Sequence, residues 1–271
     1  MAGAVSNRAR NVLLIARSTL FEQANRRLLW SLAGGALALV IGLALVGLIH
    51  PIASLSTQET ARLFARSAAG FYTLITIVVL GMGIIGYDLD SGAVIMFVSR
   101  PVSRGQYLTG RYLGNALTLA ITLCVMGLGT FAVSLLGGRA DWTLLYDFVV
   151  LAWNAAVVLA VMVALTVIAG MVAAAIIGFI TWEVVGNTYL LSGLIRAHEI
   201  TGLGARLLTA FVVIAPHVLS SPLVAGTSTS INGGQTVFVM PGPTAPDFIW
   251  SLAWIVGALA LATVLFERRA L

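Results

Sequence analysis

Charge is scarce in this chain of 271 residues. Asp, Glu, Lys and Arg together make up 9% of the sequence, whereas hydrophobic residues make up 59% and the mean hydropathy is +1.02. A water-soluble domain cannot cover its surface with so few polar groups, so the composition indicates an integral membrane protein. Lysine is absent, and all fifteen basic residues are arginine. Without lysine there is no Gly-x-x-x-x-Gly-Lys-Ser/Thr loop, which excludes ATP binding by a loop of that kind.

Cysteine and histidine are also rare. The one cysteine, Cys124, lies inside an apolar run, so an internal disulfide and a thiolate metal cluster are both excluded. We interpret Cys124 as a small apolar side chain buried in the membrane. The histidines, His50, His198 and His217, stand at the ends of apolar runs or between them. This argues against paired haem ligands and against an intramembrane serine protease, so we expect no catalytic residue, metal or cofactor in this chain.

Long apolar runs are abundant. A membrane-crossing helix needs about 20 apolar residues, and the runs that meet or approach this length are 28–49, 70–86, 112–136, 148–182 and 248–266. The run 148–182 is too long for one crossing and contains Gly170 near its centre. We interpret it as two spans joined by a tight turn, the alternative being a single tilted helix.

The sequence therefore predicts an all-α integral membrane protein of one domain with six transmembrane helices. These spans are expected at about residues 28–49, 68–87, 112–136, 147–168, 172–194 and 248–266.

The arginines are unevenly distributed over the six predicted spans. One side carries Arg8, Arg10, Arg17, Arg26, Arg27, Arg100, Arg104, Arg111, Arg268 and Arg269. The other side carries Arg62, Arg66, Arg139, Arg196 and Arg206. The positive-inside rule predicts that both termini face the cytoplasm. A basic inner face suits anionic membrane lipid as a partner and requires no nucleic acid.

Residues 8–27 precede the first span and carry five of the arginines. Apolar residues recur among them at spacings of three and four, which predicts an amphipathic helix lying in the headgroup plane and bending sharply into the first span. The alternative is a basic flank that sets the topology without any contact role. The first apolar run is too long and starts too late for a cleavable signal peptide, so we expect it to remain as an anchor.

The largest segment between predicted spans is 196–246, which is expected to face outward together with 50–67. Its first part, 203–225, begins with about a dozen apolar residues, too few to span, and then reaches Pro216. Whether this part is interfacial, re-entrant or an additional membrane segment stays open. The stretch 226–235 is rich in Gly, Ser and Thr and is typical of turns.

The segment 87–111 interrupts the apolar chain between the second and third predicted spans. It reads Tyr-Asp-Leu-Asp-Ser-Gly-Ala-Val-Ile-Met-Phe-Val-Ser-Arg-Pro-Val-Ser-Arg-Gly-Gln-Tyr-Leu-Thr-Gly-Arg. The order of an acidic pair, a glycine, a short apolar stretch, Arg-Pro-Val-Ser-Arg and a downstream arginine resembles the cytoplasmic loop of type-two ABC transporter permeases. Asp88 and Asp90 stand where that family usually has Glu, and Ala93 replaces the usual Thr. An ordinary basic cytoplasmic loop is the alternative interpretation.

A short coupling helix at 91–99 would dock in a groove of a cytoplasmic ATPase. Gly92 lets the chain turn out of the second span, and Pro101 ends the helix. The apolar docking surface would consist of Val94, Ile95, Met96 and Phe97.

Charged residues flank this predicted coupling helix. Arg100 and Arg104 stand on either side of the proline, where they can bind phosphates of lipid headgroups or carboxylates of the partner. Asp88 and Asp90 are expected to pair with Arg111 or with arginines of the N-terminal helix, which would lock the loop to that helix.

The resemblance implies a permease subunit of an ATP-driven exporter in the plasma membrane of a prokaryote, with residues 8–27 as an elbow helix. It also implies two copies of a separate ATPase that binds ATP and Mg²⁺, and a second permease subunit, identical or paralogous. An amphipathic or lipid-like substrate fits an apolar route, but the sequence does not identify it. The alternative is a non-transporting multispan assembly factor or membrane sensor that docks a cytosolic partner.

Two further features concern the spans themselves. Glu183 and Asn187 lie near the outer end of the fifth predicted span and are candidate pathway residues, because an ionisable group at membrane depth is costly. The alternative is an interfacial Glu next to Trp182 in the aromatic belt. Gly110 and Gly114 form a Gly-x-x-x-Gly spacing that favours close helix contact at the start of the third span.

Overall fold

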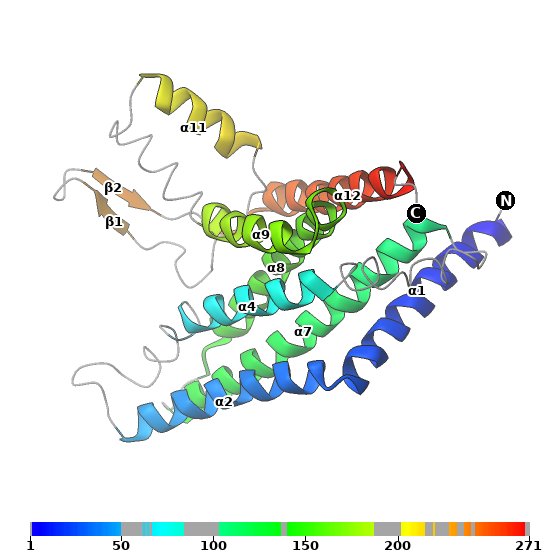
Figure 1. Ribbon diagram of the computed structural model, residues 1–271. Coiled ribbons are helices and arrows are strands. Elements are labelled where there is room, and N and C mark those ends of the chain that lie inside the picture. The colour runs from blue at the N-terminus through cyan, green and yellow to red at the C-terminus, as the bar shows by residue number, and fades with distance from the viewer. Residues whose placement is uncertain are drawn as a thin grey trace.

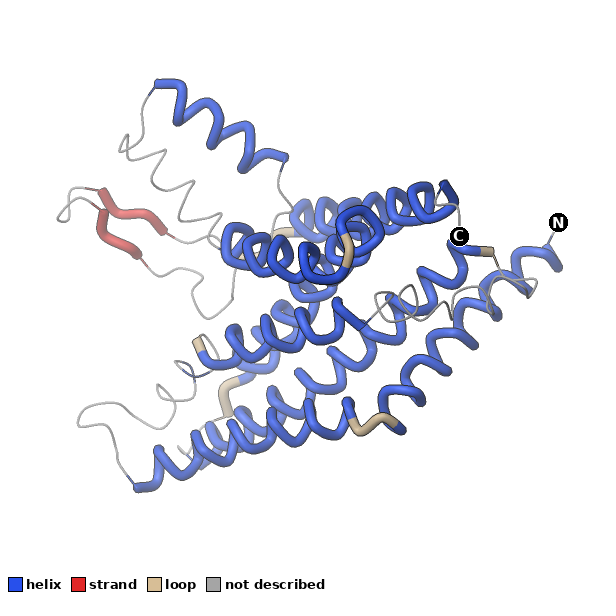
Figure 2. The backbone as a smooth tube through the Cα atoms, in the orientation of Figure 1, coloured by secondary structure: helices blue, strands red, loops and turns tan. Residues whose placement is uncertain are grey.

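The computed structural model describes residues 2–49, 62, 64, 67–83, 103–136, 140–186, 202–214, 219, 228–231, 236–239 and 242–268. The helices are α1 (Ala2–Asn25), α2 (Leu28–Ile49), α4 (Ala68–Gly83), α7 (Arg104–Leu136), α8 (Trp142–Ala169), α9 (Met171–Gly186), α11 (Gly202–Ile214) and α12 (Ala245–Arg268). The strands β1 (Ser228–Ile231) and β2 (Thr236–Val239) pair as an antiparallel hairpin. Helices dominate as predicted (Figures 1 and 2), and the hairpin is a departure from an all-helical chain, within a region expected to be a loop.

Four helices are long and apolar enough to cross a membrane, namely α2, α7, α8 and α12. The helix α4 and the part of α9 at 171–183 are apolar but shorter. Together these six helices coincide in position with the six predicted spans. The residues that follow α4 and α9, 84–102 and 187–201, lie outside the described part of the chain.

The long apolar run divides into α8 and α9 at Gly170, as the two-span interpretation predicts. Gly170 has a φ of 83°, a left-handed conformation that favours glycine. Its backbone N–H donates to Thr166 O at 3.1 Å, and its own carbonyl accepts from Ala174 N at 3.1 Å. The two helices then pack side by side, and Met162 of α8 approaches Gly178 of α9. The turn between α8 and α9 therefore consists of one residue, Gly170.

The helices α1 and α2 run one after the other along the whole of α7 (Figure 1). Ile15 of α1 lies against Gly110, and Val40 of α2 lies against Gly129 further along α7. Because the contacts advance in the same direction on both sides, α1 and α2 are parallel to α7. The predicted sharp bend between residues 8–27 and the first span is therefore not confirmed. Arg27, with a φ of 61°, marks the break between α1 and α2.

The buried core of the bundle is centred on α8, which contributes Leu159, Met162 and Val163 among its fully buried residues. The start of α7 and the end of α12 lie next to each other, because Gly105 faces Thr263. The N- and C-terminal ends of the chain are both near this end of the bundle (Figure 1).

Candidate functional site

The first third of α7 is polar and extends the predicted third span. The helix has 33 residues and is therefore about 50 Å long, whereas a bilayer hydrocarbon core is about 30 Å thick. Residues 116–136 are apolar enough and long enough to span by themselves. The predicted span 112–136 lies within one continuous helix that already begins at Arg104. Arg104 and Arg111 are thus helix residues and do not belong to a loop.

A capping box explains why α7 begins where it does. Ser103 Oγ accepts from the backbone N–H of Gln106 at 3.3 Å, and Gln106 Oε1 accepts from the backbone N–H of Ser103 at 3.2 Å. These reciprocal bonds satisfy N–H groups that a helix start leaves unpaired. A polar sequence such as Arg-Gly-Gln-Tyr can therefore continue directly into the apolar span.

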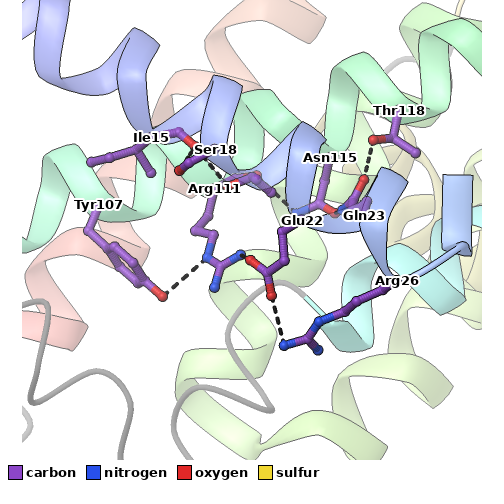
Figure 3. Close-up of polar contacts among 10 residues, drawn as sticks. Ile15, Ser18, Glu22, Gln23, Arg26, Tyr107, Arg111, Asn115 and Thr118 are labelled. Carbon is purple, nitrogen blue, oxygen red and sulfur yellow. Dashed lines mark hydrogen bonds and ion pairs between the residues drawn. The ribbon is translucent and has the colours of Figure 1, made fainter.

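Arg111 is buried between α7 and α1 and pairs with Glu22 (Figure 3). Its Nη1 lies 2.7 Å from Glu22 Oε2, and its Nε donates to the Tyr107 hydroxyl at 3.2 Å. The guanidinium also lies over the Tyr107 ring, 5.7 Å from the ring centroid. The other carboxylate oxygen of Glu22 pairs with Arg26 at 2.9 Å. One carboxylate of α1 therefore joins two arginines, Arg111 of α7 and Arg26, which follows the last residue of α1.

An uncharged network lies one turn further along the same interface (Figure 3). Gln23 Nε2 donates to Asn115 Oδ1, and Thr118 Oγ1 donates to Gln23 Oε1. Asn115 Nδ2 donates to the backbone carbonyl of Arg111 at 2.9 Å. Gln23, Asn115 and Thr118 are all buried. Burial makes each bond costly to break without replacement, since water cannot take the place of the lost partner. We call Glu22, Gln23, Arg111, Asn115 and Thr118 the α1–α7 clasp.

Glycines bring the two helices close enough for the clasp to form. A Cβ atom at Gly110 would lie 2.6 Å from Ile15 Cβ, and one at Gly114 would lie 2.8 Å from the backbone carbonyl of Ala16. Neither contact leaves room for a side chain. The close contact predicted from the Gly-x-x-x-Gly spacing is confirmed, and its partner is α1.

Arg104 ties the start of α7 to the end of α12. Its Nη1 donates to Phe266 O at 2.8 Å and to Glu267 O at 3.4 Å, and its guanidinium lies 5.6 Å from the Phe266 ring centroid. Carbonyls at a helix C-terminus lack intrahelical donors and carry partial negative charge, so a guanidinium there is stabilising. The sequence-based interpretation assigned Arg104 to lipid phosphates or partner carboxylates, whereas the structure places it on helix carbonyls.

Most residues of the predicted coupling segment lie outside the described residues: Asp88, Asp90, Gly92, Val94, Ile95, Met96, Phe97, Arg100 and Pro101. Their docking role stays a prediction. The sequence analysis expected Arg111 to pair with Asp88 or Asp90. The structure shows an ion pair between Arg111 and Glu22, which the sequence analysis did not consider. Glu22 is the one acidic residue before Glu59 in the sequence, and this isolation could have indicated that it pairs with an arginine.

The candidate pathway residues are described in part. Glu183 lies near the C-terminal end of α9 and is exposed, whereas Asn187 lies outside the described residues. Their role in a pathway is therefore untested by the geometry.

At the opposite end of the bundle, an ion pair joins two segments predicted to face outward. Arg62 Nε lies 2.6 Å from Asp141 Oδ2, and Asp141 Oδ1 also accepts from the backbone N–H of Thr143. Asp141 thus caps α8, which begins at Trp142 and contains the predicted span 147–168. The segment before α4 is held against the start of α8 by this pair.

A polar contact that sequence reasoning missed lies midway along α8. Asn154 Nδ2 donates to Leu219 O at 2.9 Å, and Asn154 Oδ1 accepts from Leu219 N at 2.8 Å. Asn154 is buried and lies about 18 Å along the helix from Trp142. Irregular backbone at membrane depth requires hydrogen-bond partners from protein, and Asn154 supplies both. The chain at Leu219 therefore reaches well inside the bundle.

Comparison with known proteins identifies one family. The family model described as ABC-2 family transporter protein matches residues 22–271. The matched region begins at Glu22 and thus contains both sides of the α1–α7 clasp. A comparison with curated proteins finds no match.

Proposed function

Because the chain belongs to the ABC-2 family of transporter proteins, we propose that it is the membrane-spanning subunit of an ATP-driven exporter. Members of this family are membrane components of transporters and normally work with an ATPase partner. The match over residues 22–271 is the observation that carries the proposal. In our proposal, two copies of a separate cytoplasmic ATPase bind ATP and Mg²⁺, and a second permease subunit completes the route.

In this proposal the six apolar helices α2, α4, α7, α8, α9 and α12 all cross the membrane. An even number of crossings agrees with the position of both chain ends near the start of α7. The arginine-rich side is then cytoplasmic, in the plasma membrane of a prokaryote. The helix α1 acts as the elbow at the cytoplasmic surface, where its exposed Leu13, Leu14 and Phe21 meet lipid.

The ATPase docks on the segment 88–101, which directly precedes α7. Movement of that segment is passed to a continuous helix, because α7 begins at Arg104 and runs without interruption into the membrane. The α1–α7 clasp makes α1 follow α7, and the bonds from Arg104 to the carbonyls of α12 make the end of α12 follow as well. Three helices thus receive the movement together.

The route itself lies between two permease subunits and suits an amphipathic or lipid-like substrate. Glu183 and Asn187 line its outward half in this proposal. Placement in a hydrated route avoids the penalty that a lipid-facing carboxylate would incur.

The test is co-purification with the cognate ABC ATPase, followed by ATP hydrolysis measurements in nanodiscs. Met96→Asp with Phe97→Asp should release the ATPase while leaving the protein in the membrane. Each buried apolar side chain contributes about 1.5–3 kcal/mol to such an interface. The matched control is Leu203→Asp with Leu207→Asp, which changes two exposed apolar residues of α11 and should leave ATPase binding intact.

Three outcomes decide between the proposed functions. Binding with stimulated hydrolysis and ATP-dependent substrate movement supports the exporter. Binding with no effect on hydrolysis supports the non-transporting assembly factor or sensor instead. Failure of the wild-type chain to retain any ABC ATPase contradicts both the exporter and its coupling segment.

A further inference from the structure

An apolar groove lies between α8 and α12, apart from the α1–α7 clasp. Its volume is about 470 Å³. The buried residues Ala164 and Ala258 form its floor, and Trp250, Trp254 and Leu261 are among its larger lining residues. Every residue that lines the groove is apolar, so its occupant must be apolar as well.

The groove has the depth and length of one leaflet of a bilayer. It lies between two helices that are both long and apolar enough to cross a membrane, which places it at hydrocarbon depth. Trp250 and Leu261 are eleven residues apart on α12, or about 16 Å. Half of a hydrocarbon core is about 15 Å. A single acyl chain of one leaflet therefore fits its length.

Charge selects the end at which the headgroup lies. Arg268 follows Leu261 by seven residues and so lies two turns further on the same face of α12. Its side chain is exposed, and it forms no ion pair with any other described residue. Asp247 stands in the first turn of α12, at the opposite end. The neighbouring Glu267 lines a separate pocket with Arg8 and Ser103, on another face of α12 from the groove. A phosphate at the groove is therefore attracted to the Arg268 end and repelled by the carboxylate at the Asp247 end.

We propose that the α8–α12 groove binds one acyl chain of an anionic phospholipid whose phosphate is held by Arg268. A second copy of this chain is the competing occupant, but its arginine-rich end would bring like charge towards Arg268, because the chain has a net charge of +5. The headgroup brings the opposite charge. The site is separate from the docking segment and does not depend on the proposed export function.

Two substitutions test the two parts of this site. A Cβ at Gly257 would meet nothing within 4 Å, so Gly257→Leu fills the groove without a clash in the fold. Arg268→Gln removes the phosphate partner. The matched controls are Gly42→Leu on α2, where a Cβ also meets nothing within 4 Å, and Arg10→Gln, which lowers the net charge equally.

The measurement is quenching of tryptophan fluorescence in phosphatidylcholine nanodiscs that contain increasing fractions of phosphatidylglycerol with dibrominated acyl chains. Trp250 and Trp254 should produce a saturable component in the wild-type chain and in both controls. Gly257→Leu should abolish this component. Arg268→Gln should raise its midpoint about fivefold, the ratio that corresponds to about 1 kcal/mol for an arginine at a membrane surface.

Three results would overturn the proposal. The first is a saturable component that persists unchanged in Gly257→Leu. The second is the same component produced by dibrominated phosphatidylcholine at the same mole fraction, which would indicate unselective boundary lipid. The third is a loss of dimer in Gly257→Leu, measured by particle mass, with unaltered quenching, which would assign the groove to a second copy.

Discussion

Breaking the ion pair between Glu22 and Arg111 should destabilise the chain more than breaking the pair between Glu22 and Arg26, although both pairs share one carboxylate. The side chain of Arg111 is 10% exposed, whereas that of Arg26 is 67% exposed. Removing one partner of a fully buried pair costs about 3–5 kcal/mol. Glu22 is 33% exposed and Tyr107 still accepts from Arg111, so we expect about 1–2 kcal/mol for this pair. The exposed pair on one helix should contribute about 0.3–0.5 kcal/mol.

A double-mutant cycle measures the two coupling energies with one shared variant. Glu22→Gln is combined with Arg111→Gln in one cycle and with Arg26→Gln in the control cycle. The free energy of unfolding is obtained from loss of helical circular dichroism as SDS replaces a mild detergent. Raising the salt concentration should weaken the coupling to Arg26 but affect the coupling to Arg111 much less, because burial limits screening. Equal coupling energies in the two cycles would refute the argument that the clasp is a buried interaction.

Three further predictions concern other parts of the fold. Gly114→Leu should lower the thermal transition of the purified chain because its side chain meets α1 backbone, whereas Gly42→Leu should leave that transition unchanged; similar losses in both would contradict the close contact. Asn154→Leu should increase hydrogen exchange around residue 219, since each orphaned polar group costs about 1–3 kcal/mol, and unchanged exchange would contradict the anchor. Ser103→Cys in a Cys124→Ser background should react with an impermeant thiol reagent from the cytoplasmic side, and reaction solely from outside would reverse the proposed topology.

Much of the helical framework could be predicted because it depends on local properties of the chain. Apolar runs of sufficient length form helices in a membrane, since each helix satisfies its own backbone groups. The turn at Gly170 was predictable because one apolar run was too long and contained a residue that tolerates a positive φ. The Gly-x-x-x-Gly spacing indicated a close helix contact, although it did not identify the partner helix.

The polar start of α7 was not predicted from the sequence, because the prediction concerned the apolar span alone. Polarity marks where the hydrocarbon region ends, but a helix ends where its backbone loses hydrogen-bond partners. Ser103 and Gln106 cap a helix that begins eight residues before the predicted start of the span. The pattern of a Ser followed three residues later by a Gln is visible in the sequence and is typical of a helix start, but it was not used.

The clasp and the contact between Asn154 and Leu219 could not be predicted in the same way, because their partners are distant in sequence. Glu22 and Asn154 stood out as isolated polar residues, but identifying what they bind requires the register between helices. That register changes the interpretation of coupling. If Asp88 or Asp90 locked the loop to α1, movement would reach α1 through the loop and not through α7. In the proposed transporter, a clasp formed between two helices, at Arg111 and Asn115 of α7, would instead pass movement at residue 104 directly to α1.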